Sequence, residues 1–197
     1  MRLLVDTVSQ TNGLGFVFTD GRVIQKSFDR IKESRFMLES ISEVLAQQNL
    51  ETSNIEQLMV NVGPGSFTGI KVGLSIVQTF SLVHSTECQA FTSFDVISHL
   101  AKESNLPCEK ILIYAYQGEY FCGQRTKDSW EFSVRKKVDL DSEDWVFQGP
   151  EKFADKKWLK IPPNCIVDWS QFASECKFQA KVSPFYGKQS TAEMNLK

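Results

Sequence analysis

The segment VNVGPGSFTGIKVGLSIVQTF, from Val60 to Phe80, decides the fold of this chain. It begins with apolar residues typical of a strand, passes through the glycine turn Gly63-Pro64-Gly65, and continues with the apolar spacing of a helix. Backbone amides at the N-terminus of a helix that follows such a turn can bind phosphate. The glycines therefore allow two interpretations: a phosphate-binding turn, or a turn and helix that another backbone approaches closely.

Neither of the two common phosphate-binding motifs fits the segment. A Walker A loop requires G-x-x-x-x-G-K-[ST], but Lys71 stands two residues after Gly69 and is followed by Val72. The dinucleotide motif G-x-G-x-x-G requires one residue fewer between its second and third glycines. Phosphate binding would therefore depend on the helix N-terminus alone, and Ser66 is better explained as the N-cap of that helix.

The glycines of the segment also follow a helical pattern. Gly65, Gly69 and Gly73 recur every four residues and therefore lie on one face of the predicted helix. Glycine inside a helix costs about 1 kcal/mol relative to alanine, so these glycines need an explanation other than helix stability. A face without side chains admits a close neighbour. Two neighbours fit: the helix expected over residues 34–48 of this chain, or a second protein chain.

The composition indicates a chain with a packed core and no general attraction for polyanions. Of its 197 residues, 42% are hydrophobic and 23% are charged, and the formal net charge is -2. This charge disfavours tight binding of RNA or of an anionic membrane by the chain alone. The 5 cysteines include no C-x-x-C pair, and no run approaches the ~20 apolar residues of a membrane span. We therefore expect a cytoplasmic protein with reduced thiols.

Hydrophobic periodicity predicts an α/β fold made of two similar lobes. The first part of the chain is expected to form strands over 3–5, 14–18 and 23–28, a helix over 34–48, a strand over 58–62, a helix over 66–83 and a helix opening at 92–95. A second meander of strands is expected over 110–115, 120–125 and 130–138. The repetition indicates a duplicated architecture, with residues 1–105 as the first lobe and residues 106–197 as a smaller second lobe.

The motif GPGSFTGIKVGL, residues 63–74, is similar to the signature G-P-G-S-F-T-G-[ILV]-R-[IV]-G of the TsaB family, also called YeaZ-like or Gcp-like. Other segments resemble the family along nearly the whole chain: LLVDTVSQTNGLGFVF at 3–18, TSFDVISHLA at 92–101, AYQGEYF at 115–121 and SPFYGKQSTAE at 183–193. The resemblance implies an actin-like, sugar-kinase and Hsp70 (ASKHA) fold with two duplicated mixed-sheet lobes. The chain departs from the family at Lys71, where arginine is usual, and at Tyr114 and Tyr116, where aspartate and arginine are usual.

The same resemblance implies a subunit that is not itself the transferase. In this family a TsaD-type relative holds the metal and nucleotide and transfers a threonylcarbamoyl group to the tRNA adenosine next to the anticodon. The TsaB-type subunit pairs with that relative through the two long helices of its first lobe, and with itself when it is alone. A TsaE-type ATPase is a further candidate partner, tRNA is expected only indirectly, and no membrane is expected. ATP or ADP and a metal are expected on the partner subunit, and no cofactor is predicted on this chain.

Helical phase and the resemblance together give the candidate site residues. The partner interface is predicted on the two long helices, at Ser34, Met37, Leu38, Ile41, Phe67, Gly69, Ile70, Gly73, Leu74 and Val77. A vestigial nucleotide cleft, as the wider fold would place it, is predicted at Asp6, Thr7, Gly63 and Gly65. Asp6 has a second interpretation, as the acceptor of the turn formed by Thr7 and Ser9.

Enzymatic and structural alternatives remain beside the scaffold interpretation. An ATP-binding enzyme of the same fold would need a glycine-bearing first phosphate loop and a second acidic motif, and a stand-alone homodimeric structural protein would need no transferase. A metalloprotease, the class to which relatives of this family were long assigned, is rejected because His84 and His99 stand alone without H-E-x-x-H. G-S-F-T-G is not G-x-S-x-G, so no catalytic residue and no metal site is predicted.

Overall fold

The computed structural model describes residues 1–9, 12–28, 36–127, 129–140, 145–161, 167–180 and 182–184. The chain divides into two compact units. Unit 1 comprises Met1–Thr92 together with the returning segment Asp168–Phe185, and unit 2 contains Ser93–Val167. None of the described helices has the length and apolar character that crossing a membrane requires.

Unit 1 is built on a five-stranded mixed sheet with the strand order β3-β2-β1-β4-β5. Its strands are β1 (Arg2–Asp6), β2 (Gly13–Val17), β3 (Val23–Ser27), β4 (Gln57–Asn61) and β5 (Glu87–Phe91). The first three pair antiparallel as a meander, whereas β4 pairs parallel with both β1 and β5. The predicted meander and mixed sheet are thus confirmed, and β5 is a strand that the sequence analysis did not expect.

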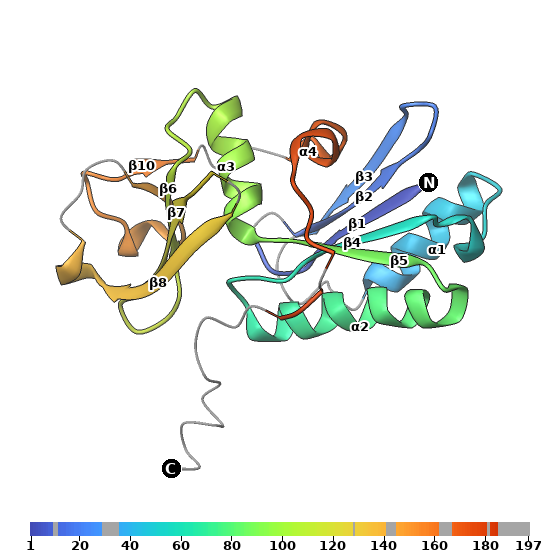
Figure 1. Ribbon diagram of the computed structural model, residues 1–197, viewed down its shortest axis with the longest axis horizontal. Coiled ribbons are helices and arrows are strands. Elements are labelled where there is room, and N and C mark those ends of the chain that lie inside the picture. The colour runs from blue at the N-terminus through green and yellow to red at the C-terminus, as the bar shows by residue number, and fades with distance from the viewer. Residues whose placement is uncertain are drawn as a thin grey trace, which may run out of the picture. The chain divides into compact units, whose positions relative to one another are not determined.

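Helices cover both faces of this sheet. Helix α1 (Met37–Gln47) and helix α2 (Phe67–His84) lie on one face, and helix α4 (Trp169–Glu175) lies on the other (Figure 1). A 3-10 helix, η2 (Thr52–Asn54), precedes β4. The apolar side of α1 is buried because its apolar residues recur at helical spacing, at Met37, Ile41, Val44 and Leu45.

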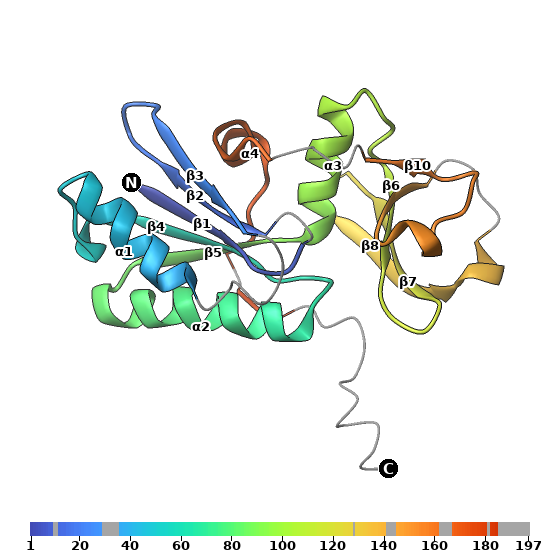
Figure 2. The same cartoon turned by 180° about the vertical axis from the view of Figure 1, so that it is seen from behind.

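Unit 2 repeats the pattern of unit 1 in a reduced form. Its five-stranded sheet has the order β10-β9-β6-β7-β8, formed by β6 (Lys110–Tyr114), β7 (Glu119–Arg125), β8 (Trp130–Lys136), β9 (Val146–Gln148) and β10 (Leu159–Lys160). An antiparallel meander, β6 to β8, is again extended by parallel pairing, here of β6 with β9 and of β9 with β10. Helix α3 (Ser93–Glu103) accompanies this sheet (Figure 2), with short 3-10 helices η3 (Lys137–Asp139) and η4 (Glu151–Phe153). Two duplicated mixed-sheet lobes, the second reduced, are therefore confirmed.

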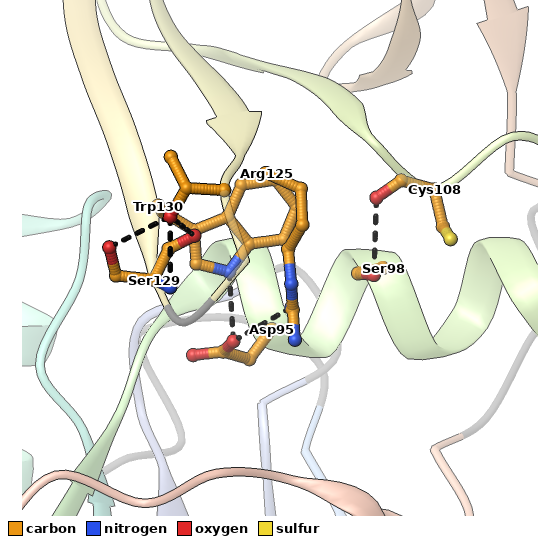
Figure 3. Close-up of polar contacts among 7 residues, drawn as sticks. Asp95, Ser98, Cys108, Arg125, Ser129 and Trp130 are labelled. Atoms are coloured by element: carbon orange, nitrogen blue, oxygen red, sulfur yellow. Dashed lines mark hydrogen bonds and ion pairs between the residues drawn. The ribbon is translucent and has the colours of Figure 1, made fainter.

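Asp95, in the first turn of α3, joins that helix to the hairpin of β7 and β8. Its Oδ1 accepts a hydrogen bond from Trp130 Nε1 at 2.8 Å and lies 3.4 Å from Arg125 Nη1 (Figure 3). The Arg125 guanidinium lies over the Trp130 ring, 5.0 Å from its centroid. Farther along the helix, the Ser98 hydroxyl donates to the Cys108 carbonyl oxygen at 3.2 Å. Polar contacts in its first turn and at its middle thus fix α3 within unit 2.

The observed division differs from the expected boundary between residues 105 and 106 in two respects. Helix α3 belongs to unit 2 because its Phe94 packs directly on β7, where a Cβ on Gly123 would lie 2.6 Å from the Phe94 ring. The chain returns to unit 1 at Asp168 because Trp169 and Phe172 of α4 pack on Phe91 of β5, with ring centroids 6.1 and 5.1 Å apart.

Candidate functional site

The glycine turn between β4 and α2 lies against the turn that follows β1. Gly63 has a φ of 105°, in the left-handed region that favours glycine. A Cβ on Gly65 would lie 2.7 Å from Val8 Cγ1 and 3.2 Å from the Val8 carbonyl oxygen. The turn is therefore rich in glycine because a backbone of this same chain approaches it closely.

The glycine face of α2 contacts the same β1 turn. A Cβ on Gly69 would overlap the Thr7 carbonyl oxygen, and a Cβ on Gly73 would lie 2.6 Å from Thr7 Oγ1. The close neighbour of these glycines is thus neither the preceding helix nor a second chain, the two neighbours considered from the sequence. It is Thr7 in the turn after β1, through its backbone at Gly69 and its side chain at Gly73, and a sequence pattern within α2 does not identify this neighbour.

Hydrogen bonds fix the first turn of α2 in this position. Thr7 Oγ1 donates to the Gly69 carbonyl oxygen at 2.6 Å, and Gly69 N donates to Ser66 Oγ at 3.1 Å. Ser66 is the N-cap of α2, as predicted. One of the unpaired amides that every helix N-terminus presents is thereby satisfied within the chain.

Asp6 is fully buried at the carboxyl end of β1 and connects the two turns. Its Oδ1 accepts hydrogen bonds from Val8 N at 2.9 Å, from Ser9 N at 3.0 Å and from Asn61 Nδ2 at 3.0 Å. Its Oδ2 accepts from Ser9 Oγ at 2.5 Å. Asn61 Oδ1 in turn accepts from Gly63 N at 2.9 Å. These contacts are those of a turn acceptor, which was the second interpretation of Asp6.

Burial raises the pKa of Asp6 above its ordinary value, although the hydrogen bonds from Ser9, Val8 and Asn61 oppose this shift. The carboxyl group is thus kept in place by the chain's own donors in a site without water contact. The vestigial nucleotide cleft at Asp6, Thr7, Gly63 and Gly65 stays a prediction. Among their polar groups, the Asp6 carboxylate, the Thr7 hydroxyl and the Gly63 amide already take part in hydrogen bonds within the chain.

Asp6→Asn is expected to gain stability relative to the unchanged chain as the pH rises. Because the folded pKa lies above the ordinary value of 3.8, the Asp6 contribution is fully present below pH 3.8 and is lost as the pH rises through the folded pKa. Asparagine does not titrate, and its Oδ1 still accepts from the Val8 and Ser9 amides. Urea unfolding of both proteins from pH 4 to pH 8 measures the difference in free energy of unfolding, which we expect to grow with pH.

Asp20→Asn is the control for this prediction. The Arg22 side chain and backbone amide lower the pKa of Asp20, which is exposed, so its stabilising contribution is fully present above the ordinary value of 3.8 and is lost only as the pH falls through the lower folded pKa. The difference in free energy of unfolding between Asp20→Asn and the unchanged chain should therefore stay nearly constant from pH 4 to pH 8. A difference for Asp6→Asn that is equally independent of pH would mean that hydrogen bonds, not burial, dominate the Asp6 pKa.

The structure separates the predicted interface residues into two groups. Leu38 and Phe67 are exposed, by 52% and 36%, and Ser34 lies outside the described residues. The others are buried within unit 1: Met37, Ile41, Gly69, Ile70, Gly73, Leu74 and Val77. Because the apolar side of each helix covers the sheet, burial argues against direct contact between this second group and a partner. The interface prediction therefore narrows to the exposed side of the helices.

The exposed side of α2 forms a continuous stripe along the helix, called here the α2 stripe: Phe67, Thr68, Lys71, Ser75, Gln78, Thr79, Leu82 and Val83. At its start the Lys71 ammonium lies over the Phe67 ring, 4.2 Å from the centroid. At its end Leu82 and Val83 are 85% and 66% exposed. Neither of these last two residues was predicted from the sequence, although the helical phase of Leu82, opposite Gly73, was a usable signal.

Metal ligands do not gather in the part of the chain that the structure describes, where no group of three or more His, Cys, Asp or Glu side chains could hold a metal ion. His84 ends α2, and its Nε2 lies 2.9 Å from Thr52 Oγ1. His99 is buried in α3, with Nε2 3.5 Å from Glu103 Oε1. His84 thus lies at the end of a helix and His99 within one.

Comparison with known proteins relates the chain to a family of tRNA-modifying enzymes. The family model for TsaD, tRNA N6-adenosine threonylcarbamoyltransferase, matches residues 32–132. A protein of Mycoplasma pneumoniae, the uncharacterised MG208 homologue, is 28% identical over 100 residues, covering 51% of this chain and 48% of that protein. The chain thus spans about half the length of this curated relative.

Two solved structures of Pseudomonas aeruginosa proteins are similar in fold to this chain. An uncharacterised protein with similarity to the peptidase YeaZ has a TM-score of 0.58 at 18% identity, and the match covers 75% of each chain. YeaZ has a TM-score of 0.56 at 18% identity, again over 75% of each chain. At this identity the likeness establishes the fold, and the expected actin-like (ASKHA) α/β class is confirmed.

Proposed function

We propose, since this chain belongs to the TsaD family of tRNA N6-adenosine threonylcarbamoyltransferases and is TsaB-like, that it is a non-catalytic subunit of a tRNA-modifying complex. In this proposal it binds a TsaD-type transferase and supports threonylcarbamoylation of the tRNA adenosine next to the anticodon. The partner holds ATP or ADP and the metal. A TsaE-type ATPase joins the complex, and the chain forms a homodimer when it is alone.

The observation that carries the proposal is the α2 stripe, which lies within the segment that matches the family. Leu82 and Val83 present apolar side chains that the described chain leaves uncovered, and Phe67 adds a partly exposed aromatic ring. Small polar residues, Ser75 and Thr79, separate these ends of the stripe and leave room for a facing helix. Exposed apolar side chains along one helix face are typical of a surface that binds another protein.

The contacts of Asp6 support a non-catalytic role. An ATP-binding enzyme of this fold would direct its first-strand carboxylate toward a nucleotide or its metal. Here both oxygens of that carboxylate accept hydrogen bonds from the chain itself, and the amide of Gly63 is used by Asn61. The glycine turn therefore supports the position of α2, the helix that we propose as the partner-binding element.

We expect the chain to form an equimolar complex with the TsaD-type subunit of the same cell, and Leu82→Glu to weaken that complex at least ~30-fold. A carboxylate at the centre of an apolar contact loses its hydration without gaining a partner, and residues of this kind cost about 2 kcal/mol or more when changed. Size exclusion with light scattering on the separate and mixed proteins measures the complex, and titration calorimetry measures its affinity.

Val138→Glu is the matched control, since Val138 in η3 of unit 2 is 88% exposed and receives the same change in charge. It should bind the transferase as the unchanged chain does. A chain that ignores the transferase would contradict the proposed function, and a stable homodimer in that case would favour a stand-alone structural protein. If Leu82→Glu binds as tightly as Val138→Glu, the α2 stripe is not the contact surface.

A further inference from the structure

Gly69, in the first turn of α2, is held by contacts with the turn after β1 and with the N-cap of the helix. The Thr7 hydroxyl donates to the Gly69 carbonyl oxygen, and Ser66 accepts from the Gly69 amide. The Thr7 carbonyl oxygen lies where any side chain on Gly69 would begin. The carbonyl oxygen and the amide of Gly69 are thus hydrogen-bonded, and the Thr7 backbone leaves no room for a side chain there, which fixes the position and the rotation of the first helical turn.

The residues opposite this contact belong to the α2 stripe. Each residue of a helix is turned by about 100° from the one before it, so positions two residues from Gly69 point away from Thr7. These positions are Phe67 and Lys71, which are exposed and contact each other. A rotation of α2 about its axis at the Thr7 contact would therefore change the direction in which both side chains point.

Thr7 itself is held by the sheet. It is buried, and it follows Asp6, whose carboxylate binds the amide of Val8 on one side and Asn61 of β4 on the other. Because β1 and β4 are paired strands, the position of Thr7 follows from the sheet and not from α2. A chain of contacts thus runs from the sheet through Asp6 and Thr7 to Gly69.

We infer that Thr7 is a positioning residue for partner binding: its hydroxyl fixes the first turn of α2, so that Phe67 and Lys71 point toward the transferase subunit. Thr7 lies in the core and does not touch the partner. This inference rests on the proposed function, because it takes the α2 stripe as the surface that the partner contacts.

Thr7→Val tests the inference, because valine keeps the shape of threonine and removes the hydroxyl. We expect the folded variant to bind the TsaD-type subunit about tenfold more weakly, a size of effect found for residues that act on a binding site through a packed network. We also expect the amides of residues 69–73 to exchange hydrogen at least ~10-fold faster, since the first turn of α2 opens more often. Thr7→Ser retains the hydroxyl and should restore both affinity and exchange protection.

Thr86→Val is the matched control. Thr86 is buried in the same unit, and its hydroxyl also donates to a backbone carbonyl, that of Ile55 at 3.2 Å, without contacting the first turn of α2. It should cost similar stability and leave partner affinity unchanged. If Thr7→Val and Thr86→Val lose partner affinity equally, general destabilisation explains the loss, and the inference is overturned.

The two readouts separate this inference from the proposed function. If the unchanged chain does not bind the transferase, the proposed function fails, and partner positioning fails with it. Hydrogen exchange then still decides whether Thr7 holds α2. If the unchanged chain binds and Thr7→Val alters neither affinity nor exchange relative to Thr86→Val, the proposed function stands and the inference about Thr7 is overturned.

Discussion

Replacing Gly69 by alanine is expected to lower the free energy of unfolding by about 3 kcal/mol, although alanine is the better helix former by about 1 kcal/mol. The added Cβ would overlap the Thr7 carbonyl oxygen, which is a backbone atom. That backbone cannot move aside at low cost, because the amides of Val8 and Ser9 are bound to the buried Asp6 carboxylate. Urea unfolding followed by circular dichroism measures the loss.

Ser75→Ala on the same helix is the control for Gly69→Ala. Ser75 is exposed, so alanine there changes helix propensity without a new contact and should be neutral or stabilising by about 0.5 kcal/mol. We expect the change in free energy of unfolding for Gly73→Ala to lie between those of Gly69→Ala and Ser75→Ala. The nearest neighbour of its added Cβ would be the Thr7 side-chain oxygen, at 2.6 Å, rather than the peptide backbone. A Gly69→Ala protein as stable as Ser75→Ala would show that the turn after β1 does not lie on this face.

The expected result for Gly69 changes how a loss of partner binding would be interpreted. The sequence placed Gly69 in a candidate partner interface, so a loss of pairing in a Gly69 variant would have been interpreted as a lost contact with the partner. The structure places Thr7 on that face, 62 residues earlier in the chain. Reduced pairing of a Gly69 variant would therefore follow from lost folding. Substitutions in the α2 stripe, and not in the glycine face, are the direct test of the partner surface.

The glycine pattern predicted that another segment packs closely against α2, but it did not identify that segment. A repeat of four identifies one face of a helix, whereas the segment that packs there depends on how strands pair over long separations. For the same reason, the interface predicted from the sequence mixed residues of the core with residues of the surface. Apolar residues in helical phase, such as Ile70 and Val77, mark the side that covers the sheet, whereas the exposed Leu82 and Val83 lie off that phase.

Among the elements that escaped prediction, β5 and α4 did so for different reasons. β5, with the sequence ECQAF, is partly exposed at its start and shows no clean alternation of apolar and polar residues. α4 has the right signals: Asp168 accepts hydrogen bonds from the amides of Ser170 and Gln171 as N-cap, and Trp169, Phe172 and Ala173 follow helical spacing. Its 7 residues are too few for periodicity alone to distinguish it from a loop.

Trp169→Ala is expected to lower the free energy of unfolding of unit 1 by about 4 kcal/mol, the largest single loss from a side chain in α4. Trp169 is buried, and its ring lies 6.1 Å from that of Phe91 and 5.5 Å from that of Phe172. The indole fills the space above Gly15 of β2, where no other side chain could fit with it. Phe132→Ala, which truncates an exposed aromatic ring of β8, should cost less than about 1 kcal/mol. Urea unfolding compares the two variants.

Gly15→Ala gives this prediction a test that general destabilisation cannot imitate. With Trp169 present, a Cβ on Gly15 would lie 2.6 Å from Trp169 Cγ, so we expect Gly15→Ala alone to cost about 2 kcal/mol or more. In a Trp169→Ala background the same methyl group enters the space that the indole has left, and its cost should fall close to zero. The double variant would then be more stable than the sum of the single losses predicts, by a coupling of about 2 kcal/mol. Additive losses would mean that Trp169 and Gly15 are not in contact and that α4 does not cover this face of the sheet.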